Sequence, residues 1–433
     1  MSETAKRLVP PTPLSRRLAT QSLLFASAEG TFVTGSAFYL KEFVGLTAPQ
    51  VGLGLTIGMV ASLTLAYPMG RIVDLVGPKR MWGLGAIGSA LVFGCWPFIG
   101  GFWPYVAVVL VFSVIEAAGG AGRNAYILDV MPPKERVETQ AYMYSSLNVG
   151  FTLGSILSGI ALAIPDDRAL QWGVPTFSLV VGILNAFWIH RLPKASHDLR
   201  RESGEKAVKP TTPGPLRNPG WMVLSMFKGT MWTNQVLLHT VIPLWLVYET
   251  DSPRWLLAWL FGTNTVMCIF LPAYTSRGVR NVGDALKRVG WSAGFYVLAC
   301  AITLITHDTR GLFTIALVWL GHVAVTGAEL AISAASWALE AELMDPERRG
   351  EYGGVAEVFQ GLGSAWAPAL FTFLAMQWDP GLFTGVGWFV IAAIVVVAAI
   401  GMVPAGHAAA RFRDQHFPHA AAEYVPPEAV GKS

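Results

Sequence analysis

The 433-residue sequence has few charged residues, few cysteines and none of the common nucleotide-binding or hydrolytic motifs. Only 14% of its residues are charged while 53% are hydrophobic, and a mean hydropathy of +0.47 is too high for a soluble protein of this size. The three cysteines lie singly in apolar runs, which excludes a disulfide framework. Because no phosphate-binding glycine loop, zinc-type His/Glu pair or nucleophile elbow is present, we expect no enzyme, no metal and no cofactor.

Long apolar runs, separated by short charge-bearing breaks, make up most of the chain. About 20 apolar residues of helix cross the roughly 30 Å hydrocarbon core of a bilayer, where every backbone polar group must be paired internally. We therefore predict an all-α membrane protein with twelve transmembrane helices in two groups of six. The twelve spans lie near residues 18–40, 50–70, 81–99, 103–124, 140–164, 171–190, 220–248, 255–276, 286–306, 311–337, 352–377 and 381–404.

The distribution of lysine and arginine predicts the orientation of these spans. If both termini are cytosolic, 26 of the 31 basic residues fall on the cytosolic side, Lys41, Arg168, Arg254 and Arg310 fall outside, and Lys228 lies within a span. The net charge of +3 then reflects membrane topology and not nucleic-acid binding, because the basic residues are spread over separate loops. The first apolar stretch is too long for a signal peptide. We predict a multi-pass protein of the cell membrane.

Charge and proline content divide the chain into five segments. We predict a cytosolic N-terminal arm over 1–17, a first six-helix half over 18–190 and a second half over 219–404. Residues 191–218 are polar, basic and proline-bearing, which is typical of a cytosolic connecting loop. Residues 405–433 are expected to be a disordered cytosolic tail.

The two predicted halves repeat one another. Residues 131–138, MPPKERVE, match residues 344–351, MDPERRGE, at an offset of 213. The same offset aligns two further pairs, Glu116 with Glu329 and Gly150 with Gly363. A shared basic loop and a shared glutamate in the same span order indicate duplicated six-helix halves.

The charged break between the second and third spans reads GRIVDLVGPKR. Gly70, Asp74, Gly77, Lys79 and Arg80 occupy the Gly-x-x-x-Asp-x-x-Gly-x-Lys/Arg-Lys/Arg signature of the major facilitator superfamily. Twelve spans in two sixes, with this loop in this place, resemble that superfamily over nearly the whole chain.

The resemblance implies a cytosolic gate at this loop. In families with the signature, the aspartate and its basic partners latch the two halves on the cytosolic side. Gly70 and Asp74 share a helix face at i and i+4, so the glycine lets another helix come close to the carboxylate. A carboxylate is favourable at the N-terminus of a facing helix. By the resemblance, that helix is the eleventh span, which starts around Gly350 and Glu351. Arg123, at the end of the fourth span, is assigned to the same gate. The basic residues also satisfy the positive-inside rule without any gating role.

The corresponding loop of the second half departs from the signature. Residues 277–284 read RGVRNVGD, which keeps basic residues and a glycine but places Arg280 where Asp74 would align. One latch is therefore intact and the other degraded.

A glycine-rich stretch in the fifth span resembles the motif of drug/proton antiporters. Gly150, Gly154 and Ser158 repeat every four residues on one helix face, but Ser155 stands where that motif has proline. The early fourth span also lacks the arginine usual in drug antiporters, reading VFSVI at 111–115. A contact between helices with small facing residues explains the same spacing without any transport direction.

Several ionisable residues lie inside predicted spans. Such a group costs at least about 3 kcal/mol at mid-bilayer and usually faces a cavity, and by the resemblance spans one, four, seven and ten line the central cavity. Six candidates for substrate binding or proton coupling follow: Glu29, Glu116, Lys228, His239, His322 and Glu329.

Glu116 is the first candidate for a proton carrier. Desolvation and neighbouring charges shift the proton equilibrium of a buried carboxyl group, so Glu29 or Glu116 could exchange protons with the cavity. Arg123 lies seven residues beyond Glu116 on the same helix face and could bias it. The alternative for each glutamate is a permanent ion pair, for instance with Lys228. Each histidine could simply be satisfied by one hydrogen bond.

These features predict a secondary active transporter that works by alternating access and couples efflux of a small amphipathic compound to protons. One alternative is a proton-coupled uptake symporter for a small organic anion, with Lys228 as the anion contact. Another is a membrane sensor that no longer transports. The expected partners are a small-molecule substrate, protons and membrane lipid, with no nucleic acid, and we expect a monomer.

Overall fold

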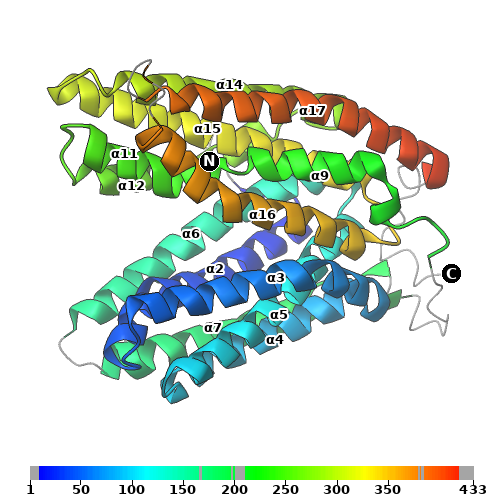
Figure 1. The fold of residues 1–433 in the computed structure, drawn as a ribbon. Helices are drawn as coiled ribbons and strands as arrows, with labels where there is room; N and C mark the ends of the chain where they lie inside the picture. The colour runs from blue at the N-terminus through cyan, green and yellow to red at the C-terminus, as the bar shows by residue number, and fades with distance from the viewer. Residues whose placement is uncertain are drawn as a thin grey trace. The chain divides into compact units, whose positions relative to one another are not determined.

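A computed structural model of the chain describes residues 9–164, 168–196, 198–199, 210–378, 381 and 385–418, and every regular element among them is helical (Figure 1). The predicted arm 1–17, loop 191–218 and tail 405–433 lie partly outside these residues. The contacts divide the chain into two units. The boundary between them along the sequence follows Thr212, within the predicted loop. Unit 1 precedes this point and also includes Asp345–Gly354, while unit 2 consists of Pro213–Met344 and Val355–Pro418.

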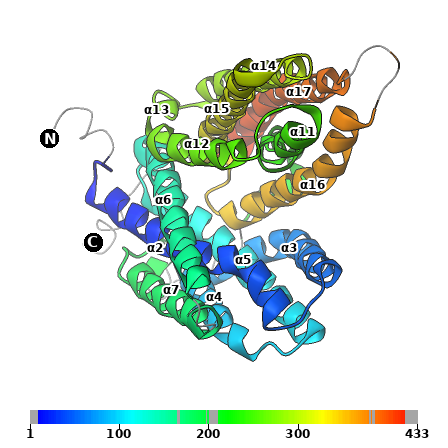
Figure 2. The ribbon, with the colours of Figure 1, turned by 90° about the vertical axis from the view of Figure 1, so that its left-hand side faces the viewer.

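Unit 1 contains six long helices. They are α2 (Pro13–Glu42), α3 (Ala48–Val76), α4 (Pro78–Cys95), α5 (Phe102–Val130), α6 (Arg136–Ala163) and α7 (Val174–His190), with the short turns η1 (Trp96–Phe98), η2 (Pro133–Glu135) and η3 (Ala169–Gly173). Helix α2 packs on α6 and α7, and α4 packs on α5 and α7 (Figure 2).

Local sequence signals fix where the first two of these helices start. Thr12 and Ser15 form a capping box before α2, and Thr47 and Gln50 form one before α3, so that in each case a side-chain oxygen accepts a hydrogen bond from an otherwise unpaired N–H of the first turn. Each helix also has a proline in its first turn, whose ring fixes φ near the helical value. The missing N–H of proline costs no hydrogen bond there, because N–H groups of the first turn have no partner within the helix.

Unit 2 is built from a longer series of helical elements, the last but one of which begins with six residues, 349–354, that belong to unit 1. They are η4 (Pro215–Arg217), α9 (Pro219–Met231), α10 (Asn234–Val236), η5 (Leu237–Val241), α11 (Ile242–Glu249), α12 (Leu256–Phe270), α13 (Pro272–Thr275), α14 (Val282–Ile305), α15 (Gly311–Leu343), α16 (Arg349–Met376) and α17 (Gly387–His416). Helix α9 packs on α17, and α14 packs on α15 and α17. These neighbours repeat the α2–α7, α4–α5 and α4–α7 pairs of unit 1 in the same chain order, as expected for duplicated halves.

Glycines allow the closest helix approaches in both units. A Cβ atom at Gly150 would collide with the carbonyl oxygen of Leu23 in α2, and one at Gly154 would collide with the backbone of Ser27 and Thr31. In unit 2, a Cβ atom at Gly363 would collide with the carbonyl of Gly229 in α9. The glycines aligned by the repeat therefore make the corresponding contact in each unit. The spacing in the fifth span is a packing feature.

We expect Gly154→Val to destabilise the protein by at least about 2 kcal/mol, because the new side chain enters a contact between backbones that cannot yield. Thermal unfolding of the purified protein in detergent measures this change. Gly159→Val is a matched control, since it makes the same substitution in the same helix where nothing lies within 4 Å of the added Cβ. Equal losses in the two variants would show that helix propensity, and not packing against α2, sets the cost.

Nine helices of the described residues are long and apolar enough to cross a membrane, by composition and length, where the sequence predicts twelve spans. The three others differ for visible reasons. Helix α2 has 30 residues but a polar composition, and α12 has only 15 residues before Pro272 starts the short α13. The predicted span 220–248 is broken into α9, α10, the π-helical η5 and α11. The count of twelve and the cytosolic termini stay predictions.

The last helix is longer than the sequence suggests. Helix α17 continues through Pro404 to His416, so residues 405–416 are helical and not part of a disordered tail. An interior proline ends most helices of soluble proteins, but membrane helices tolerate it when neighbours satisfy the freed backbone group. The helix therefore extends twelve residues beyond the predicted boundary at 404.

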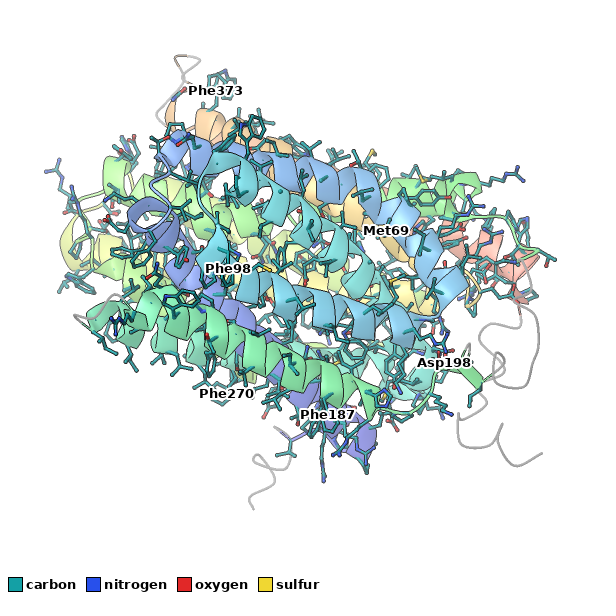
Figure 3. The ribbon with its side chains drawn as sticks, turned by 90° about the horizontal axis from the view of Figure 1, so that it is seen from below. Met69, Phe98, Phe187, Asp198, Phe270 and Phe373 are labelled. Carbon is teal, nitrogen blue, oxygen red and sulfur yellow. The ribbon has the colours of Figure 1, made fainter. Side chains whose placement is uncertain are left out.

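Large apolar side chains are exposed on the outer surface of each unit. Phe98 and Phe187, labelled in Figure 3, are 75% and 52% exposed, and Leu312 and Ile400 of unit 2 are 84% and 65% exposed. Exposure of this extent is unusual for a soluble monomer and suits a surface covered by lipid. Together with the nine apolar helices, it identifies a multi-pass membrane protein.

Candidate functional site

The predicted contact of Asp74 is present in unit 1. The backbone N–H groups of Gly350 and Glu351 donate to the two carboxylate oxygens of Asp74, with N–O distances of 2.8 and 2.9 Å. Helix α16 begins at Arg349, so Asp74 accepts hydrogen bonds from N–H groups of its first turn, where the helix dipole favours an anion. Gly70 makes the approach possible, because a Cβ atom there would collide with the carbonyl oxygen of Gly350.

Further charges surround the first turn of α16. Glu351 accepts from the Arg348 guanidinium at 3.0 Å, and the exposed Arg71 lies 3.9 Å away. Arg349 is buried and forms an ion pair with Asp129 of α5 at 3.3 Å. Sequence reasoning did not identify Asp129. The repeat held a signal for it, because the offset of 213 places Asp129 on another acid, Glu342.

Lys79 of the signature loop contacts the end of α7. The Lys79 ammonium donates to the carbonyl oxygens of His190 and Leu192, at 3.0 and 2.6 Å, and so satisfies free carbonyls at the end of α7. Arg80 is exposed. Gly77 is both the C-cap residue of α3 and the N-cap residue of α4. Its φ of +111° is a backbone conformation that requires glycine.

A second feature of unit 1 is a cluster of three half-buried charges, which we call the α2–α5 charge cluster: Glu29, Glu116 and Arg123. Glu116 accepts a hydrogen bond from the Ser89 hydroxyl of α4 at 2.6 Å. Glu29 lies within electrostatic range of both Glu116 and Arg123. Arg123 is predicted in the gate, but its guanidinium donates to the Ser22 hydroxyl of α2 at 3.4 Å. We therefore group it with the two glutamates.

Unit 2 contains a cluster of aromatic and polar side chains on η5, α12 and α15. The ring of His239 stacks on the ring of Phe261 with 5.7 Å between the ring centroids. The rings of Phe261 and His322 pack edge to face with 6.3 Å between their centroids. One turn along α12, the Asn264 amide donates to Glu329 at 2.9 Å. His239 is within electrostatic range of Glu329. The structure thus brings together three of the six predicted ionisable residues, His239, His322 and Glu329.

Lys228 lies apart from this cluster in an ion pair of its own. Its ammonium contacts the carboxylate of Glu340 in α15, and the two side chains are only 4% and 18% exposed. Glu357 of α16 is within electrostatic range of both. The partner of Lys228 within unit 2 is therefore Glu340.

Asn234 begins α10, at the break in the predicted seventh span. It is fully buried, and neither its amide oxygen nor its amide nitrogen has a hydrogen-bond partner among the described residues. An unpaired buried amide is costly, so such groups are retained mainly where they serve a ligand, a water or a conformational change. Asn234 is a candidate binding residue of unit 2.

A family model described as Major Facilitator Superfamily matches residues 18–368 of the chain. The chain belongs to the major facilitator superfamily. It is accordingly a membrane transporter and not an enzyme, as the sequence predicted. The drug/proton antiporter subtype stays a prediction. Within the described residues, no group of three or more His, Cys, Asp or Glu side chains is placed to hold a metal ion.

One curated relative of this facilitator is the phosphoglycerate transporter protein of Salmonella typhimurium. The two are 26% identical over 204 residues, which is 45% of this chain and 44% of the relative. The match thus spans less than half of the relative's length.

Solved structures show the same fold at low identity. A bacterial homologue of the iron transporter ferroportin, in an outward-facing state with soaked iron, aligns with a TM-score of 0.68 and 14% identity over 91% of this chain and 99% of that chain. The human organic anion transporter MFSD10 aligns with a TM-score of 0.59 and 17% identity over 90% and 100%. The proton:xylose symporter XylE aligns with a TM-score of 0.60 and 14% identity over 89% and 94%. These structures support the fold alone.

Proposed function

We propose that this facilitator works by alternating access and couples the export of a small amphipathic compound to protons, with Glu116 as the proton carrier. The α2–α5 charge cluster is the observation that carries the proposal. Two carboxyl groups and one guanidinium within electrostatic range make the charge of each group depend on the others, so binding or release of one proton changes the field of the whole cluster.

The aromatic cluster of unit 2 supports an amphipathic substrate. His239, Phe261 and His322 offer ring faces and edges, while Asn264 and Glu329 add polar groups one turn away. A few polar groups among aromatic side chains are typical of sites that bind compounds with both apolar and polar parts. The Asp74 contact with the start of α16 supports a gate that opens and closes in each cycle, because its hydrogen bonds join a single side chain to two backbone groups.

Uptake of a small organic anion is the second candidate, and the match to the phosphoglycerate transporter favours it. Its predicted contact, Lys228, is already paired with Glu340. Arg123 is the alternative cation, since its Nε atom is buried without a hydrogen-bond partner in the described part of the chain. A sensor that no longer transports is the third candidate.

Flux in proteoliposomes with an imposed pH gradient separates these candidates. We expect an amphipathic dye such as ethidium to move against the proton flow, and an internal pH dye to report the counter-moving protons. Co-directional movement of protons and phosphoglycerate would favour the anion symporter. No proton movement with either probe would favour the sensor.

We expect Glu116→Gln to abolish proton-driven flux while leaving the protein folded, since glutamine keeps the hydrogen bond from Ser89 but carries no exchangeable charge. Glu42→Gln is the control, because Glu42 pairs with Lys41 at the exposed end of α2. Proton-driven flux in Glu116→Gln equal to that of the wild type would refute the assignment of the carrier.

A further inference from the structure

The segment made of the loop between α13 and α14 and the first two turns of α14, which we call the α13–α14 loop, carries four cations and one acid. The cations are Arg277, Arg280, Lys287 and Arg288, and the acid is Asp284. Asp284 lies 3.6 Å from the Lys287 ammonium. Within the described ranges none of the three arginines forms an ion pair, so the loop presents unneutralised positive charge. This is the loop in which Arg280 aligns with Asp74 of the first half.

A long apolar groove begins at this loop. It has a volume of about 460 Å³ and runs between α12, α14 and α15 of unit 2. Arg288 and Trp291 line one end and Ile302 the other, with Phe295 and Leu298 between them. Fourteen residues of helix separate Arg288 from Ile302, or about 21 Å. One leaflet of the hydrocarbon core is roughly 15 Å deep, so the groove is long enough for an acyl chain.

Of the three arginines, Arg288 lines the mouth of the groove, and its hydrogen bond to the backbone brings Arg277 next to it. The Arg288 guanidinium lies 4.6 Å from the centre of the Trp291 ring and donates to the carbonyl oxygen of Arg277 at 3.0 Å. The Arg277 guanidinium lies 5.1 Å from the ring of Tyr274. Cation–π contacts of this kind restrict a long side chain and leave the edge of the guanidinium open to an anion. The mouth is therefore preorganised for a phosphate group.

We propose that this groove binds an anionic phospholipid, with its phosphate at Arg277 and Arg288 and one acyl chain along α14. Positive charge at one end of an apolar groove complements a molecule with an anionic head and a long apolar chain, and basic pockets between membrane helices select such lipids. The degraded latch has thus become a lipid site in the second half. In the predicted orientation it takes lipid from the cytosolic leaflet.

The test is lipid binding to the full-length protein in detergent, measured by native mass spectrometry and by the shift in unfolding temperature. The probes are dioleoylphosphatidylglycerol, dioleoylphosphatidylcholine and inorganic phosphate. We expect phosphatidylglycerol to bind at least tenfold more tightly than phosphatidylcholine. Arg277→Gln/Arg288→Gln should weaken phosphatidylglycerol binding roughly 20-fold, since each cation near an anionic headgroup contributes about fivefold. Inorganic phosphate should neither bind tightly nor compete.

Two further variants make the result specific. Arg254→Gln/Arg310→Gln removes the same charge from exposed loop positions of unit 2 and should leave phosphatidylglycerol binding unchanged. Ala324→Phe narrows the groove without changing its charge and should weaken binding of the long-chain lipid. Equal binding of the two lipids, equal losses in the two arginine pairs, unchanged binding in Ala324→Phe or competition by inorganic phosphate would each overturn the proposal. None of these readouts depends on transport.

Discussion

Lys228→Met is expected to destabilise the transporter by about 3–5 kcal/mol, because it leaves the carboxylate of Glu340 without its partner inside unit 2. Two charges in low dielectric support each other only as a pair, and a single charge keeps the full cost of desolvation. Thermal or denaturant unfolding in detergent measures the loss. The double variant Lys228→Met/Glu340→Leu should recover most of the stability, since it removes both charges and fills similar volume.

Lys287→Met is the matched control for this variant. Lys287 pairs with Asp284 at 3.6 Å, but its side chain is 78% exposed, so the pair is solvated and contributes less than about 1 kcal/mol. Losses of the same size in the two single variants would contradict the view that burial gives the Lys228–Glu340 pair its importance. Stable Lys228→Met protein without anion uptake would instead support the symporter candidate.

Asp74→Ala is expected to accelerate amide exchange at the start of α16 and to lower the transport rate at least tenfold. The N–H groups of Gly350 and Glu351 lose their acceptor, and hydrogen bonds to a charged group contribute about 1.5–3 kcal/mol each. Exchange at these two amides should therefore rise tenfold or more. Hydrogen–deuterium exchange with mass spectrometry of the peptide around residues 349–353 detects the change without any substrate.

The control for Asp74→Ala is Asp284→Ala. Asp284 occupies the corresponding loop of the second half, where it accepts only a long hydrogen bond from Arg280 N–H and pairs with Lys287. We expect near wild-type exchange at Gly350 and Glu351 in this variant. If Asp74→Ala exchanged no faster than Asp284→Ala, the contact would not persist in the protein in solution, and the gate proposal would fail.

Periodicity and spacing predicted the parts of this molecule that depend on local rules. Apolar runs located the long helices because a membrane helix must be apolar over its whole length. The i and i+4 spacing of Gly70 and Asp74, with the family resemblance, located a partner 276 residues away in the sequence. The repeat located Gly150 and Gly363 at corresponding helix contacts because both halves fold in the same way.

Features that depend on helix rotation could not be predicted. The seven-residue spacing of Glu116 and Arg123 predicts that these two side chains share a helix face, but the contact of Arg123 with Ser22 of α2 depends on how the two helices are rotated. The partner of Lys228 is on α15, and no spacing rule links residues 228 and 340. The break after Met231 was not predicted, because residues 220–248 contain one charged residue, Lys228, and no proline before Pro243, although Thr233, Asn234 and Gln235 make this point polar.

The single-residue connection at Gly77 has a mechanical consequence. Only Gly77 connects α3 to α4, so a rotation at the end of α3 must displace the beginning of α4. Asp74, three residues before Gly77, is hydrogen-bonded to the start of α16. Lys79, two residues after Gly77, is hydrogen-bonded to the end of α7. If the hydrogen bonds of Asp74 break, we therefore expect the end of α7 to move together with the start of α4. A displacement at the end of α7 would then report that the Asp74 contact is broken.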